Sequence, residues 1–453
     1  MSRLRKSFHL VSLGCPKNFV DAEVLAGILV REGFRASKRP EAAGVVIVNT
    51  CAFILPAREE SVEAILAAAE LKKKGHVRRL VVAGCLPQRY GKILHREIPE
   101  IDLCLGIDEI PEIASLLAGL EAPDRPPARY PKRPPRFLMD AAAPRLIEAP
   151  AFTVYLKIAD GCSNRCSYCA IPAIRGKARS RPPDDILAEA EALVSRGAKE
   201  IILVAQDTTA YGKDLKGRPH PAELLQALCS IGDLRWIRIL YAYPQRIDGR
   251  LLSVMAGSKK ICRYLDLPIQ HIDDAILRAM RRKGGSRAIR RAILAAREAV
   301  PDIALRTSLI VGFPGETKKR YGTLLDFVRE TRFDHLGVFS YSREEGTKAA
   351  LIPSRIGEKE KERRRETILE EQAAISLEIN RALVGSRQEV LVEGKSDVPG
   401  YRFVGRLKRQ APEIDGVTYL RGRSLKPGDI VDARIVDASE YDLYAETSPG
   451  PQP

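Results

Sequence analysis

Three closely spaced cysteines constrain this chain more than any other part of its sequence. Cys162, Cys166 and Cys169 follow a C-x3-C-x2-C pattern, directly after an apolar run at residues 152–158. Three thiolates in one short loop can bind three irons of a cubane cluster, which leaves the fourth iron without a protein ligand. An open coordination position is where a metal site can do chemistry. A zinc site or a set of disulfides is the alternative, but zinc sites prefer paired C-x2-C elements, so we favour the cluster.

Composition and charge narrow the class of protein. Hydrophobic residues make up 45% and charged residues 29% of the 453 positions, as in a soluble globular protein of about two to four domains. No apolar run approaches the roughly 20 residues that span a bilayer, and the basic N-terminus does not resemble a signal peptide, so we expect a cytoplasmic protein without membrane contact. Nine cysteines in such a chain are ligands or buried thiols rather than disulfides. The net charge of +16 favours an anionic partner such as nucleic acid, and a solvated basic surface is the alternative.

The first 120 residues predict a domain built on a parallel sheet. Apolar runs at 9–13, 45–49, 80–83 and 101–105 alternate with helical stretches at 20–32, 58–74 and 86–97. Cys15, Cys51 and Cys85 each follow a predicted strand, and such strand ends lie along one edge of a parallel sheet. We therefore expect these three cysteines to form a second cluster site. Buried structural cysteines are the alternative, and Cys104, which lies inside a predicted strand, fits that alternative.

Residues 121–383 predict a linker and a second, larger domain. Residues 121–150 are rich in proline and arginine, which is typical of a semi-extended, solvated linker. Six predicted strands follow at 152–158, 200–205, 236–241, 264–267, 303–311 and 335–341, with helices between them, and indicate a partial TIM-like (β/α)6 barrel. Gln206, Gln270 and Gly312 come just after three of these strands, where such barrels hold their active sites. A charged helix ends this domain near residue 383 and is explained by solvation alone.

Residues 384–448 predict a small antiparallel β-barrel of about five strands, similar in size to nucleic-acid-binding barrels. This segment holds ten Lys and Arg against eleven Asp and Glu, whereas a barrel that follows a phosphate backbone is basic. Glu413 and Asp415 stand in one turn, which favours a partner such as a basic protein over a polyphosphate. An ordinary acidic turn is the alternative. The fold class is therefore α/β, with domains at 1–120, 151–383 and 384–448.

The loop with Cys162, Cys166 and Cys169 resembles the radical S-adenosylmethionine (SAM) signature. With Cys15, Cys51 and Cys85, nearly the whole chain is similar to the methylthiotransferase family, which joins a three-cysteine domain, a radical barrel and a C-terminal TRAM barrel. One branch of that family modifies isopentenyladenosine in tRNA, and the RimO type modifies an aspartate of ribosomal protein S12. The stretches that resemble the RimO type are Ser12-Leu13-Gly14-Cys15-Pro16-Lys17-Asn18, Asn49-Thr50-Cys51-Ala52-Phe53-Ile54, Gln206-Asp207-Thr208-Thr209, Tyr241-Ala242-Tyr243-Pro244 and Pro412-Glu413-Ile414-Asp415-Gly416.

The resemblance implies two 4Fe-4S clusters, one on each group of three cysteines. It implies that SAM binds the open iron held by the Cys162 loop and is cleaved to a radical, while the second cluster holds the sulfur to be inserted. Around SAM we expect Tyr168, Gln206, Gln270 and Gly312, although a packed tyrosine, helix caps and a tight turn explain the same residues without a cofactor.

The same resemblance implies the partners and the reaction. The substrate is ribosomal protein S12, free or in the small ribosomal subunit, and its aspartate receives a methylthio group at the β-carbon. A low-potential electron donor is required, and nucleic-acid contact is secondary. The alternative function is methylthiolation of N6-isopentenyladenosine in tRNA, which the net charge and the TRAM barrel favour. A two-cluster electron carrier is a third hypothesis, and the barrel-length second domain argues against it.

Overall fold

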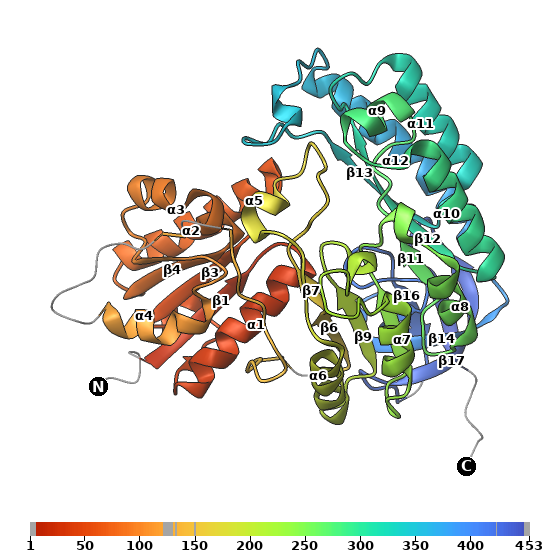
Figure 1. Ribbon diagram of the computed structural model, residues 1–453. Helices are drawn as coiled ribbons and strands as arrows, with labels where there is room; N and C mark the ends of the chain where they lie inside the picture. The colour runs from red at the N-terminus through yellow and green to blue at the C-terminus, as the bar shows by residue number, and fades with distance from the viewer. Residues whose placement is uncertain (1–5, 121–129, 132–133, 149–150, 423, 448–453) are drawn as a thin grey trace.

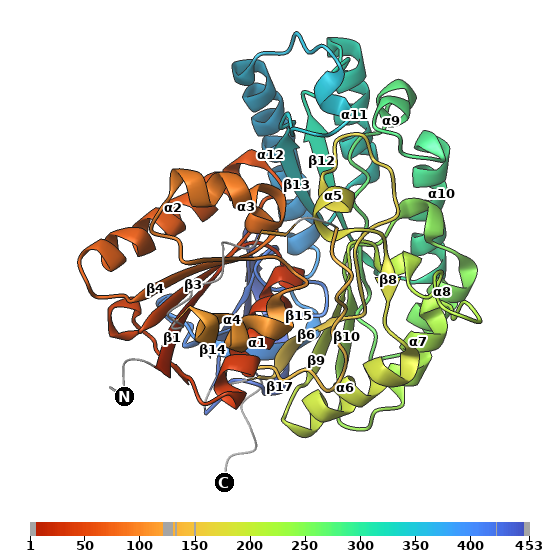
Figure 2. The same cartoon turned by 60° about the vertical axis from the view of Figure 1, so that its left-hand side comes forward.

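The structure is a computed structural model that describes residues 6–120, 130–131, 134–148, 151–422 and 424–447. A parallel sheet with its helices, coloured red to orange, lies beside the first strands of a larger barrel in both views (Figures 1 and 2). Helix α1 of the first unit contacts strand β6 of the second. Within the described ranges, every helix is too short or too polar to cross a membrane.

The N-terminal sheet has five parallel strands in the order β2-β1-β3-β4-β5. Val45 and Ile47 of β3 pack on one face of the sheet and Val46 and Val48 on the other, because side chains alternate along a strand. Both faces are covered by helices, which explains why β3 is apolar nearly throughout. The strands are β1 (Ser7–Ser12), β2 (Arg35–Ala36), β3 (Val45–Thr50), β4 (Arg79–Gly84) and β5 (Leu103–Leu105), and the helices are α1 (Pro16–Arg31), α2 (Leu55–Lys73), α3 (Cys85–Glu97) and α4 (Ile113–Gly119).

The second unit contains two parallel three-stranded sheets, β10-β9-β6 and β11-β12-β13, which meet at a bridge between Ile237 and Ile261. Six parallel strands with outer helices confirm the predicted partial barrel. The strands are β6 (Thr153–Lys157), β9 (Glu200–Val204), β10 (Trp236–Ile239), β11 (Tyr264–Asp266), β12 (Ala304–Val311) and β13 (His335–Ser340), with a short antiparallel pair, β7 (Ala159–Asp160) and β8 (Arg179–Ser180). The helices are α5 (Ile171–Arg175), α6 (Pro183–Ser195), α7 (Pro221–Cys229), α8 (Gly249–Gly257), α9 (Asp274–Ala279), α10 (Gly285–Ala299), α11 (Lys318–Thr331) and α12 (Glu358–Arg381).

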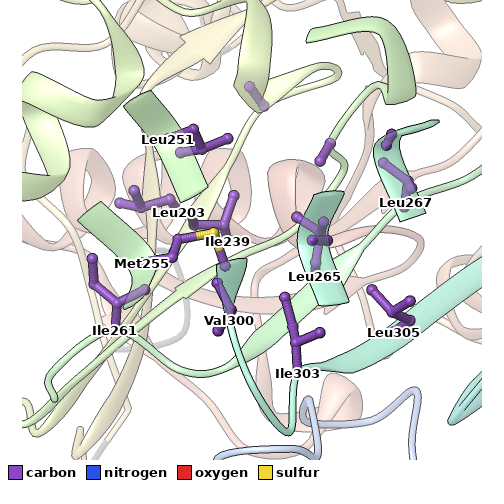
Figure 3. Packing of buried hydrophobic residues seen from close by; sticks show 14 of the residues in the cluster. Leu203, Ile239, Leu251, Met255, Ile261, Leu265, Leu267, Val300, Ile303 and Leu305 are labelled. Carbon is purple, nitrogen blue, oxygen red and sulfur yellow. The ribbon is translucent and has the colours of Figure 1, made fainter. Parts of the chain in front are cut away.

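The largest hydrophobic core lies between the barrel strands and their outer helices. Leu203, Ile239 and Leu265, from three neighbouring strands, are buried in one cluster with Leu251 and Met255 of α8 (Figure 3). Packing of this kind fixes the strand ends, and with them the loops that carry the candidate site.

The described part of the predicted linker is partly packed against both units. The side chain of Arg145 is buried, pairs with Glu23 of α1 and donates to Glu189 of α6 at 2.6 Å. Residues 134–148 are therefore only partly solvated: Pro134, Arg136 and Glu148 are exposed, whereas these carboxylates hold the Arg145 side chain at the interface between the two units. Residues 121–129, 132–133 and 149–150 of the predicted linker lie outside the described residues.

The C-terminal strands close a small barrel in the order β14-β15-β16-β18-β17, as predicted. Five strands cannot alternate in direction around a closed ring, so one neighbouring pair, β16 and β18, runs parallel. The strands are β14 (Arg387–Lys395), β15 (Phe403–Leu407), β16 (Thr418–Arg421), β17 (Ile430–Ala438) and β18 (Leu443–Thr447).

The small barrel is anchored at the end of the larger barrel where the parallel strands begin. Arg406 donates to Glu200, the first residue of β9, at 2.7 Å. Tyr264, the first residue of β11, donates through its hydroxyl to Asp415 at 2.7 Å. The opposite end, where the strands finish, carries the three-cysteine loop.

Candidate active site

Cys15, Cys51 and Cys85 lie at the carboxyl ends of three adjacent strands. Cys51 follows β3 directly, Cys85 follows β4 directly and begins α3, and Cys15 caps the start of α1 just after β1. Gly14 has a φ of +93°, and a Cβ there would lie 2.7 Å from the Cβ of Cys51. Only glycine therefore allows the Cys15 loop to come this close to Cys51.

The three thiols share one electrostatic environment. Burial, followed by the charges of neighbouring Cys85 and Cys15, raises the pKa of Cys51 to about 12. Burial alone would also raise the pKa of Cys15, but the Lys17 ammonium and the Arg175 guanidinium outweigh it and hold this pKa below its ordinary value. The thiolate form is thus favoured at Cys15, and metal binding requires thiolates.

Cys162, Cys166 and Cys169 lie in the loop between β7 and α5, beyond the carboxyl end of β6. Burial raises the pKa of Cys162 to about 11, and the charges of Asp207 and Cys166 act in the same direction. Desolvation, followed by the charge of Cys166, also raises the pKa of Cys169. These three sulfurs therefore also form one group.

Hydrogen bonds from other barrel loops hold this cysteine loop in place. Asn164 donates to Asp207 at 2.7 Å and accepts from Arg246 at 2.9 Å, and Arg246 also pairs with Asp207. The backbone N–H of Ser167 donates to the carbonyl of Met280 at 3.0 Å. A small pocket of about 20 Å³ lies beside Cys162 and is lined by Asn164, Asp207 and Arg246.

The donor sets fit iron–sulfur clusters. All nine cysteines lie within the described residues and are free thiols. Among those residues, no three His, Cys, Asp or Glu side chains converge on a single metal ion. A cubane takes one thiolate for each iron, so its ligands need not converge on one point. Cys104 is different, because burial alone raises its pKa to about 12 and it lies within β5.

Gln206 offers an unsatisfied acceptor next to the loop. Its amide nitrogen donates to Asp160 at 2.9 Å, while its Oε1 is buried and has no hydrogen-bond partner among the described residues. Tyr168 is partly buried in the loop itself, and its hydroxyl accepts from Arg282 at 3.5 Å. Both positions suit contact with a polar cofactor, and their roles stay predictions.

Gln270 and Gly312 also lie at strand ends, in different surroundings. Gln270 follows β11 with a φ of +72°, a strained conformation for a residue with a side chain. Gly312 follows β12 with a φ of +73°, and a Cβ there would lie 2.4 Å from Lys361 of α12. Packing against α12 thus explains this glycine, and its contact with a cofactor stays a prediction.

Polar contacts join the two cysteine groups across the interface between the units. The Lys17 ammonium lies 3.3 Å from the centre of the Tyr241 ring, and Lys157 of β6 pairs with Asp21 of α1. Tyr241 has a φ of +61°, so the residues that follow β10 and β11 share an unusual backbone conformation. The interface between the units therefore runs from the Cys15 loop to the carboxyl ends of β6 and β10, at the same end of the barrel as the Cys162 loop.

Sequence reasoning missed several residues of this site. Arg175 lies in contact with both sides of the interface, but a lone arginine has no recognisable spacing. Ser340 ends β13 and Tyr341 follows it, and both have buried hydroxyls without a partner among the described residues. Their position at the end of the last predicted strand was the one available signal.

Comparisons with protein families divide the chain in three. Residues 7–106 match the uncharacterized protein family UPF0004, residues 156–328 match the radical SAM superfamily, and residues 384–447 match the TRAM domain.

Individual relatives match along nearly the full length. The ribosomal protein uS12 methylthiotransferase RimO of Syntrophus aciditrophicus (strain SB) is 57% identical over 98% of this chain and 99% of its own. The protein of the same name from Geobacter sulfurreducens is 48% identical over the same shares. Among solved structures, the radical SAM methyltransferase TsrM from Kitasatospora setae, with cobalamin and a [4Fe-4S] cluster bound, resembles this fold with a TM-score of 0.56 at 15% identity, covering 85% of this chain and 80% of its own.

Proposed function

Because the chain belongs to the RimO family of ribosomal protein uS12 methylthiotransferases, we propose that it attaches a methylthio group to the β-carbon of an aspartate in uS12. It is a radical SAM enzyme that uses SAM and two 4Fe-4S clusters. The observation that carries the proposal is the pair of three-cysteine groups on adjoining units, at one interface.

We assign one cluster to Cys162, Cys166 and Cys169, and the other to Cys15, Cys51 and Cys85. When bound, the clusters and SAM supply a carbon-centred radical and the sulfur that is inserted. The protein's part is to hold both groups of thiolates at one cavity and to keep water out of it.

Other side chains orient SAM and the loop around it. The free Oε1 of Gln206 would accept a hydrogen bond from the polar part of SAM, while Asp160 fixes the amide. Asn164, Asp207 and Arg246 keep the cysteine loop in one conformation. Tyr168, Gln270 and Gly312 complete the proposed cofactor site.

In this proposal, nucleic acid contacts the large (β/α)6 barrel rather than the near-neutral TRAM domain. Residues 278–297 hold eight Lys and Arg and no Asp or Glu. Arg278, Arg287 and Arg291 are exposed, and among the described residues they form no ion pair within 4.0 Å. This basic surface, on α9 and α10 (Figure 1), begins beside Arg282, which contacts Tyr168 in the cysteine loop. RNA of the small subunit would therefore meet the enzyme near its active site.

The enzyme works in the cytoplasm, where ribosomes are, and takes electrons from a low-potential donor. Its domains are residues 1–120, 151–383 and 384–448, joined by the segment 121–150.

Deletion of the gene tests this function. Mass spectrometry of ribosomal proteins and of tRNA nucleosides from the same cells should show uS12 without its methylthio group and unchanged tRNA. Loss of a methylthio nucleoside with unchanged uS12 would instead support the tRNA alternative and refute the proposal.

A further inference from the structure

Arg175 lies on the helix that follows the Cys162 loop, yet its side chain reaches the other cysteine group. Its Nη2 donates to the sulfur of Cys85 at 3.5 Å and to Oδ1 of Asn18 at 3.2 Å. The residue thus belongs by sequence to one proposed cluster loop and by contact to the other.

Two carboxylates fix the orientation of this guanidinium. Nη1 of Arg175 lies 2.8 Å from Asp21 of α1 and 3.0 Å from Asp160 of β7. The side chain is 1% exposed, and Lys157 offsets the second negative charge by pairing with the same two carboxylates. A buried guanidinium held by several partners has little freedom to turn away from the sulfur.

Asn18 extends the contact to the other two cysteines. Its amide nitrogen donates to the carbonyl of Leu13, before Cys15, at 2.6 Å, and to that of Thr50, before Cys51, at 3.3 Å. Its oxygen accepts from Arg175. Arg175, on the helix after the Cys162 loop, therefore supports all three loops of the second group. It contacts the Cys85 loop directly and the other two through Asn18.

We propose that Arg175 is a positioning residue for the second cluster, where its guanidinium stabilises the Cys85 thiolate as a ligand and raises the reduction potential of the cluster. The inference rests on the proposed function, in that Cys15, Cys51 and Cys85 must hold a cluster. Hydrogen bonds to cluster sulfurs and nearby positive charge set such potentials, because the reduced cluster carries one more negative charge. The bond to Cys85 is charge-assisted, which makes it stronger than a neutral one.

The test uses a full-length parent in which Cys162, Cys166 and Cys169 are all replaced by Ala, so that only the second cluster contributes. Iron content and the midpoint potential are measured after anaerobic reconstitution. In this parent, Arg175→Gln should lower the potential or lose the cluster. Arg175→Lys keeps the charge and should bind the cluster with a potential nearer to that of the parent.

Arg181→Gln is the matched control. Arg181 is equally buried, pairs with Asp185 and Glu189 and donates to the carbonyl of Lys157, but among the described residues it has no hydrogen bond to a cysteine sulfur. This control should leave cluster content and potential unchanged. A parent potential retained in Arg175→Gln would overturn the inference, and so would equal loss of the cluster in all three variants. If the parent itself binds no cluster, the proposed function fails and the inference falls with it.

Discussion

The amide oxygen of Gln206 is a buried acceptor that no group among the described residues satisfies. If SAM donates to it, Gln206→Leu should raise the dissociation constant of SAM about tenfold, since a missing hydrogen bond costs about 1.4 kcal/mol. Isothermal titration with the reconstituted protein measures this constant.

Gln372 provides the control for this substitution. Its Oε1 is also buried without a partner among the described residues, but its nitrogen donates to Phe333 and Ser376, at the end of the barrel where β13 begins. Gln372→Leu should leave SAM binding unchanged. Equal weakening in both variants would mean that Gln206 acts through the fold and not through the cofactor.

Single residues also show where sequence reasoning stops. The cysteine groups were predictable because their spacing and their places after strands follow from ligand number and sheet geometry. Arg175 and Lys17 were not, because a cation on one unit shows no pattern until the partner on the other unit is known. Gly312 was predictable as a strand-end glycine, but only the structure shows that Lys361 occupies the space beside it.

At the scale of elements, the first residue of β9 holds the small barrel on the large one. Glu200 is fully buried and bonds Arg238 at 2.8 Å and Arg406 at 2.7 Å. Burial alone would raise the pKa of Glu200, but Arg406 and Arg238 outweigh it and lower this pKa to about 2.

Lowering the pH from 4.5 toward 2 should therefore weaken the junction between the two barrels. The unfolded chain takes up the proton near the ordinary value of 4.5, whereas the folded chain does so near 2. The carboxylate thus contributes on the order of 3 kcal/mol above pH 4.5, and this contribution disappears as pH falls toward 2. Glu200→Gln should lower the free energy of unfolding by about 3 kcal/mol or more at pH 7, and its difference from the native protein should shrink below pH 4.5. Denaturant titrations at several pH values measure both.

Glu360→Gln is the comparison for this prediction. Its pKa is also lowered to about 2, by hydrogen bonds from Arg363 and Arg364, but Glu360 lies in a solvent-exposed part of α12. Water screens such a pair, so the substitution should cost less than about 1 kcal/mol. A cost for Glu200→Gln no larger than this would contradict the junction described here.

Most elements were predictable from the sequence, and the exceptions share a cause. The long strands of both sheets were identified because apolar runs at regular spacing are a strong signal. Strands β2, β7 and β8 have two residues each, which is too short for any periodicity. The packing of residues 134–148 was missed because the proline content indicates extension, and the buried pairing of Arg145 depends on carboxylates from two distant helices.

For the whole molecule, the basic surface on α9 and α10 should govern association with small ribosomal subunits. Replacing Arg278, Arg287 and Arg291 together with Gln should weaken binding and reduce its dependence on salt, by about one unit of slope for each phosphate that the variant no longer neutralises. Fluorescence anisotropy over a range of salt concentrations measures this slope.

Two ion-paired arginines of α12 serve as the control for this charge change. Arg363 and Arg365 are bonded to Glu360 and Glu362, so their replacement with Gln should leave the slope nearly unchanged. An unchanged slope in the α9 and α10 variant would assign RNA binding to another surface.

The central claim is that the two cysteine groups do different parts of one reaction. Reconstituted native protein, Cys51→Ala and Cys104→Ala are each given SAM, reductant and small ribosomal subunits, and the mass of uS12 and the release of 5′-deoxyadenosine are measured. The native protein and Cys104→Ala should both replace one hydrogen of uS12 with a methylthio group. Cys51→Ala should still cleave SAM but leave uS12 unmodified, and full methylthiolation by this variant would contradict the account.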